Sequence, residues 1–84
     1  MLQTITLVRD FYEQRDHKIR KDIDENFVVS NTRNIISDLW DDVMQLYAEL
    51  DNPMLETAEY HELNAELDCD LKLIEELKKL LNRR

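Results

Sequence analysis

The fold is decided by residues 32–50, which read TRNIISDLWDDVMQLYAEL. On a helix at about 100° per residue, the apolar side chains of this stretch fill an arc of about 180° and the acidic ones an arc of about 100° opposite. The apolar residues are Ile35, Ile36, Leu39, Trp40, Val43, Met44, Leu46, Tyr47 and Leu50, and the acidic ones are Asp38, Asp41, Asp42 and Glu49. Because one helix cannot cover so wide an apolar face, we expect this helix to be central, with a neighbour on each flank.

The preceding segment predicts an amphipathic helix over residues 4–26. Its apolar residues recur at steps of three, four or seven. They are Ile5, Val8, Tyr12, Ile19, Ile23 and Phe27. Arg15 and Asp16 interrupt this stripe. A break is expected at residues 28–31, where two β-branched residues precede two N-cap candidates, Ser30 and Asn31.

A third helix is predicted over residues 57–82. Pro53 disfavours helix in the residue before it and is well placed to begin a new one. The helix has a narrow apolar stripe, formed by Tyr60, Leu63, Leu67, Leu71, Ile74 and Leu81. Its second half adds an adjoining column of Leu73, Leu77 and Leu80, which we expect to form an oligomer contact.

These elements predict a single all-α domain over residues 1–84. The chain has no glycine and one proline, which disfavours sheets and tight hairpins. Two arrangements fit the pattern. One is a three-helix up-down-up bundle, and the other is a helical hairpin with an additional N-terminal helix, which would dimerise into a larger bundle. The added leucine column favours a homodimer or a hetero-oligomer over a monomer.

Charge and cysteine content restrict the class of partner. The net charge of −8 disfavours direct binding to nucleic acid or to an anionic membrane. The single cysteine, Cys69, cannot form an internal disulfide, which is typical of the reducing cytoplasm. The N-terminal residues lack the features of a signal peptide, and no apolar run approaches the roughly 18 residues that cross a bilayer. We therefore expect a cytoplasmic protein without a membrane partner.

A run of one charge sign carries the functional prediction. Between Arg33 and Lys72 the chain has eleven carboxylates and no lysine or arginine. Such a surface repels itself and favours a partner with a basic surface. We therefore predict a non-enzymatic interaction module, a regulator, inhibitor or chaperone-like adaptor. The predicted partner-binding residues are Asp38, Asp41, Asp42, Glu49, Glu59, Glu62, Glu66, Asp70 and Trp40.

Two other interpretations need no enzyme. The acidic face could be a solvated surface, partly balanced by the basic side of the N-terminal helix. It could also mimic DNA, because Asp38, Asp42 and Glu49 are separated along the helix axis by about 6 and 10 Å, loosely comparable with phosphate spacing. As a DNA mimic, the protein would inhibit a nucleic-acid-binding protein by competing with duplex DNA.

A metal-dependent enzyme is the remaining alternative. The pairs Asp38-x-x-Asp41 and Glu59-x-x-Glu62 resemble, in spacing, the acidic motifs of all-α MazG-type nucleotide pyrophosphohydrolases. The resemblance implies carboxylates on neighbouring helices that hold Mg²⁺ for hydrolysis. A shared metal requires these carboxylates between the helices, whereas the two aspartates are predicted to point away from the apolar arc. We therefore predict no catalytic residue, metal or cofactor.

Overall fold

The computed structural model describes residues 2–16 and 23–82, which contain four helices and no strand. The helices are α1 (Leu2–Asp16), α2 (Glu25–Ser30), α3 (Thr32–Leu50) and α4 (Thr57–Asn82). The all-α class is confirmed. Within these ranges no helix is both long enough and apolar enough to cross a membrane.

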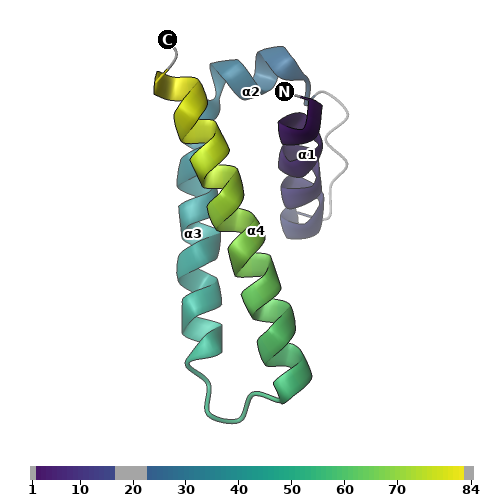
Figure 1. The fold of residues 1–84 in the computed structure, drawn as a ribbon, viewed down its shortest axis with the longest axis vertical. Coiled ribbons are helices and arrows are strands. Elements are labelled where there is room, and N and C mark those ends of the chain that lie inside the picture. Colours follow the sequence, from purple (N-terminus) through teal and green to yellow (C-terminus); the bar gives the residue numbers. More distant parts are fainter. Residues whose placement is uncertain (1, 17–22, 83–84) are drawn as a thin grey trace.

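The two long helices, α3 and α4, form an antiparallel hairpin (Figure 1). Their bounds are those predicted from the sequence. After α3, the backbone N–H of Asp51 still donates to the Tyr47 carbonyl at 3.2 Å. The Asn52 side chain then accepts from the backbone N–H of Met54 at 3.0 Å, and Pro53 lies between them. This local hydrogen bonding ends α3 and turns the chain toward α4.

The hairpin encloses most of the core. Its buried side chains come from both long helices. The core residues of the hairpin are Ile35, Leu39, Val43, Leu46, Leu67, Leu73, Ile74 and Leu77. Leu73 and Leu77 are 3% and 0% exposed and Leu80 is half-buried. Leu73 and Leu77 therefore pack inside the protein and are not available for the oligomer contact predicted for them, whereas the contact of Leu80 stays a prediction.

The N-terminal region differs from the predicted helix over residues 4–26. Helix α1 is described to Asp16, residues 23 and 24 are not helical, and α2 continues through residues 28–30, where a break was expected. Residues 17–22 lie outside the described part. The physical cause at α2 is a cap, because the Asp24 carboxylate accepts from the Phe27 backbone N–H at 2.9 Å. The break before α3 is reduced to Asn31.

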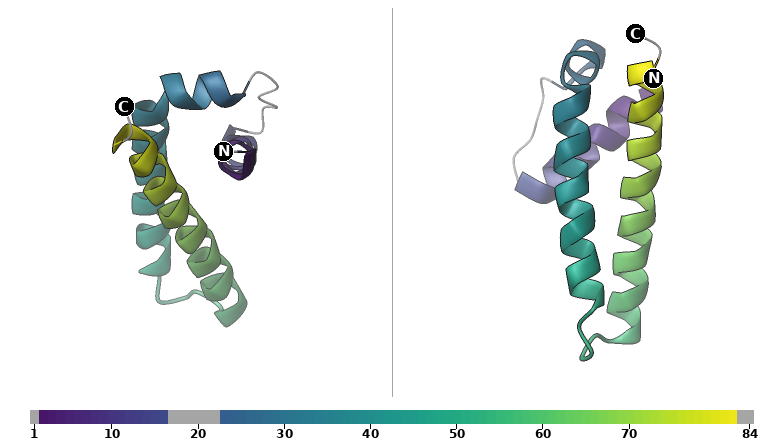
Figure 2. Two further views of the ribbon diagram at one scale, coloured as in Figure 1. Left: turned by 45° about the horizontal axis from the view of Figure 1, so that its top comes forward. Right: turned by 90° about the vertical axis from the view of Figure 1, so that its left-hand side faces the viewer.

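Helix α1 lies across one face of the hairpin. The right-hand view of Figure 2 shows it behind α3 and α4, with the opposite face of the hairpin toward the viewer. Four of its side chains, Ile5, Val8, Phe11 and Tyr12, are buried. The Tyr12 hydroxyl donates to the Asp38 carboxylate of α3 at 2.7 Å, and the Arg9 Nε donates to the Ile23 carbonyl at 2.7 Å. These contacts attach α1 to α3 and to the start of the α2 segment.

This placement corrects the predicted role of α3. We expected its apolar arc to be covered on both flanks and its aspartates to face solvent. Instead α1 covers the flank that carries Asp38 and Asp42, and both residues are half-buried. The other flank is open, since Trp40 and Met44 are 40% and 68% exposed. Helix α1 packs on this flank because the Tyr12 hydroxyl donates a hydrogen bond to Asp38. The position of apolar residues on α3 does not predict such a polar contact.

Candidate acidic cleft

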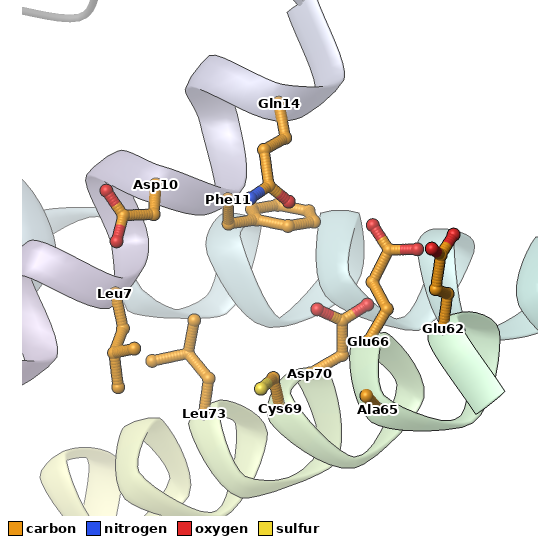
Figure 3. Close-up of a pocket in the computed structure, with 10 residues that line it drawn as sticks. All are labelled: Leu7, Asp10, Phe11, Gln14, Glu62, Ala65, Glu66, Cys69, Asp70 and Leu73. Atoms are coloured by element: carbon orange, nitrogen blue, oxygen red, sulfur yellow. The ribbon is translucent and has the colours of Figure 1, made fainter. Parts of the chain in front are cut away.

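A cleft of about 570 Å³ separates α1 from α4 (Figure 3). Helix α1 lines the cleft with consecutive turns of one face, and α4 lines it with the face that borders the core. The lining residues are Leu7, Asp10, Phe11 and Gln14 from α1, and Glu62, Ala65, Glu66, Cys69, Asp70 and Leu73 from α4. The steps of three and four in both sets place these side chains on one face of each helix.

Two leucines lie at one end of the cleft, where Asp10 also lies, and two glutamates lie at the other end (Figure 3). Figure 3 shows Leu7 and Leu73 facing each other at one end, with the Phe11 ring nearer the middle. Toward the other end the carboxylates of Glu66 and Glu62 project from α4 toward α1. An apolar floor beside several carboxylates suits a ligand that combines an apolar group with a positive charge.

A smaller hollow of about 80 Å³ joins the cleft to α3. It shares Phe11, Gln14, Glu66 and Asp70 with the cleft and adds Asp42. Asp70 is 6% exposed, so it is a buried part of the junction of the three helices. Carboxylates from α3 and α4 therefore meet in the smaller hollow, and Asp10 adds a carboxylate from α1 to the adjoining cleft.

The acidic surface continues toward the connection between the long helices. A further hollow of about 350 Å³ is lined by Glu49, Glu59 and Glu62, together with Asn52, Leu55 and Leu63. Glu62 belongs to both the cleft and this hollow. We call the exposed or half-buried carboxylates that line these three spaces the acidic band; they are Asp10, Asp42, Glu49, Glu59, Glu62 and Glu66.

Partial burial and the negative charges of the acidic band change the pKa of Glu66. Partial burial raises the pKa of the Glu66 carboxyl above its ordinary value of 4.5, and the negative charges of Asp42 and Glu49 raise this pKa further. A carboxylate that is harder to ionise in the folded protein opposes folding at neutral pH. A cation bound in the cleft would relieve this repulsion.

Replacing Glu66 with glutamine should stabilise the protein at neutral pH. Because the folded-state pKa is raised, the stability that protonation of Glu66 supplies is present at low pH and is lost as the pH rises through the folded pKa. The Glu66→Gln variant should therefore gain about 0.3 kcal/mol at pH 7, the size of an exposed charge interaction, with no gain below pH 4.5. Urea denaturation at several pH values measures this difference. Glu75→Gln, at an exposed position of α4, is the control. An equal gain in stability in this variant would mean that the lower net charge, and not the position of Glu66, causes the gain.

The structure divides the predicted partner-binding residues into three groups. Asp42, Glu49, Glu59, Glu62 and Glu66 belong to the acidic band, whereas Asp70 is buried at its inner end. Asp38 is half-buried and accepts the Tyr12 hydrogen bond, and Asp41 is exposed on α3 away from the cleft. Trp40 lies on the other flank of α3, with the Lys78 ammonium 5.6 Å from its ring centre.

The α1 residues of the cleft were missed from the sequence. The predicted stripe of the N-terminal helix passed through Tyr12, whereas Leu7, Phe11 and Gln14 lie on an adjoining column. The spacing of Leu7 and Phe11, one turn apart, was the available signal. Asp10 was also missed, because it lies outside the run between Arg33 and Lys72.

The two alternatives built on carboxylate spacing gain no support from this geometry. The aspartates assigned to DNA mimicry do not form an outward row, because Asp38 and Asp42 are half-buried on the α1 side. In the two ranges of chain that the structure covers, no three His, Cys, Asp or Glu side chains are arranged to hold a metal ion. Cys69 is an exposed free thiol in the wall of the cleft, and His61 is exposed against the Tyr60 ring.

No protein-family model matches the chain, and no curated protein or solved structure is significantly similar to it.

Proposed function

We propose that this protein is a small non-enzymatic interaction module that binds a basic partner protein through the acidic cleft. One observation carries the proposal: carboxylates from α1, α3 and α4 surround an apolar space of about 570 Å³ and the smaller hollow that adjoins it. A solubilising surface needs exposed charge but gains nothing from gathering it around an apolar floor. The convergence therefore favours recognition of a partner.

The cleft favours a segment that alternates apolar and basic side chains. An apolar side chain would occupy the end between Leu7 and Leu73. A neighbouring lysine or arginine would then reach Glu62 or Glu66, and an arginine can pair with a carboxylate through two parallel hydrogen bonds. The rest of the acidic band would speed the encounter by long-range attraction. In the cytoplasm, such a module would act as a regulator, inhibitor or chaperone-like adaptor of the protein whose basic segment it covers.

A peptide probe of this chemistry tests the proposal. We expect a fluorescent peptide of alternating arginine and leucine to bind the full chain at low salt, with an anisotropy change that weakens as salt rises. An arginine–serine peptide of equal charge should bind more weakly, because it leaves the Leu7 and Leu73 end unfilled. Glu66→Lys should weaken binding of the arginine–leucine peptide by roughly 10-fold, as loss and reversal of one interfacial charge do.

Asp41→Lys is the matched control. It makes the same change in net charge at an exposed position of α3 outside the cleft, so it should weaken binding much less than Glu66→Lys. Equal losses in both variants would mean that diffuse negative charge attracts the peptide, and an absence of binding at low salt would reject the proposal. A cell protein that is retained by Asp41→Lys but lost by Glu66→Lys is then the candidate natural partner.

A further inference from the structure

The face of the hairpin opposite α1 carries large exposed apolar side chains. Trp40, Met44 and Tyr47 of α3 are 40%, 68% and 52% exposed, and Tyr60 of α4 is 49% exposed. The half-buried Ile36 begins the same row on α3, at steps of three and four residues. We call these five residues the open face. The right-hand view of Figure 2 shows the hairpin from the side opposite α1.

Helix geometry places the open face away from the cleft. Asp38 and Asp42 point toward α1, and Trp40 lies two residues, or about 200°, from each of them. Lys78 marks the same side on α4, because its ammonium lies over the Trp40 ring. Tyr60 precedes Lys78 by five helical turns and so falls on the same column of α4.

The α3 column of the open face is oppositely charged at its two ends. On α3 its column begins at Arg33 and ends at Asp51, both exposed. The side chains between them on this column are uncharged: Ile36, Ser37, Trp40, Met44, Tyr47 and Ala48. Two charges of opposite sign lie beside this column near its middle, since Asp41 is exposed one turn from Ser37 and Met44 and the Lys78 ammonium lies over the Trp40 ring. In a chain of net charge −8, the open face is therefore close to charge balance.

We propose that the open face is a self-association surface, on which two copies pair through their α3 helices in antiparallel orientation. The register that places Arg33 opposite Asp51 of the second copy also places Trp40 opposite Met44 of the second copy. A two-fold axis near residue 42 generates both contacts twice, as a self-complementary interface requires. This surface is separate from the cleft, so the two proposals stand or fall independently.

Charge selects a second copy as the occupant. A basic partner would be attracted to the acidic band on the other face, whereas the open face sets Arg33 and Lys78 beside Asp41 and Asp51 and so offers it no net attraction. A second copy supplies a cation and an anion at the required ends. The four exposed side chains of the open face, those of Trp40, Met44, Tyr47 and Tyr60, are each about half exposed and together present on the order of 400 Å² of apolar surface. An apolar patch of this size is enough to mark an interaction site and to form the core of a small interface.

Sedimentation equilibrium of the full chain tests this surface. We expect a monomer–dimer equilibrium in the wild type, and Met44→Glu should weaken dimerisation by roughly 100-fold, because a charge enters the centre of both halves. Gln45→Glu, which adds the same charge at an exposed position outside the open face, should leave the equilibrium nearly unchanged. Far-UV circular dichroism confirms that the variants remain folded.

A charge exchange tests the register. Arg33→Asp should weaken the dimer roughly 2- to 20-fold, in the range of two exposed ion pairs, and the added change Asp51→Arg should restore it. A wild type that stays monomeric to about 100 µM would overturn the proposal. So would a dimer that Met44→Glu leaves intact. A dimer that the charge exchange fails to restore would overturn the antiparallel register.

Discussion

Replacing Leu77 with alanine should lower the free energy of unfolding by about 2–5 kcal/mol. Leu77 is 0% exposed and lies in the core between the long helices, so truncation removes apolar contacts and leaves a cavity. For a chain of 84 residues the total is only about 5–10 kcal/mol, so this one change should remove a large part of it. Urea denaturation followed by circular dichroism measures the difference.

Met54→Ala is the control for this prediction, because Met54 is 84% exposed and its truncation should change stability by less than about 0.5 kcal/mol. The two variants also separate the core role of Leu77 from the oligomer role predicted from sequence. If Leu77→Ala altered self-association but left the unfolding of the monomer unchanged, the leucine column would be a contact surface and the packing described above would be wrong.

Replacing Phe11 with alanine should cost about 3–5 kcal/mol and should also abolish binding in the cleft. The Phe11 ring is 7% exposed, packs at 5.1 Å from the Tyr12 ring and lines both the cleft and the smaller hollow. Its loss should detach α1 from the hairpin. The same denaturation experiment measures the cost, and the arginine–leucine peptide reports the loss of the cleft.

Leu2→Ala is the matched control on the same helix, because Leu2 is 83% exposed. It should leave both stability and peptide binding nearly unchanged. If Phe11→Ala behaved like Leu2→Ala, α1 would not be packed on the hairpin. A large loss of stability with unchanged peptide binding would instead place the peptide site away from α1.

The bounds of α3 and α4 could be predicted because their signals are local. Pro53 and the apolar spacing both act within a few residues of the helix ends that they define. Asn31 precedes α3 as expected, although its side-chain amide donates to the Phe27 carbonyl and makes no capping hydrogen bond. The all-α class follows from the same signals and from the absence of glycine. The end of α1 was harder, because the apolar period continues through Ile19 and Ile23 although α1 is described to Asp16 and residue 23 is not helical.

The side on which α1 lies could not be predicted, because it depends on a contact between distant residues. Tyr12 and Asp38 are 26 positions apart, and a helical wheel of α3 alone records Asp38 only as a charge on the polar side. The same limit misplaced the leucine column, since Leu73 and Leu77 seemed surplus to one stripe but are buried in the core that α4 shares with its neighbours. The cleft depends on both the side on which α1 lies and the face of α4 that borders the core, since residues of these two helices line it.

The central claim is that α1 lies on the acidic flank of the hairpin and leaves the Trp40 flank open. A nitroxide on Cys69 tests it most directly, because Cys69 is the single cysteine, is exposed and lines the cleft. In the NMR spectrum of the labelled chain, we predict that the amide signals of Leu7, Asp10 and Gln14 broaden strongly, while the indole N–H of Trp40 broadens much less. Sharp signals from these α1 amides, or stronger broadening at Trp40 than at α1, would contradict the account.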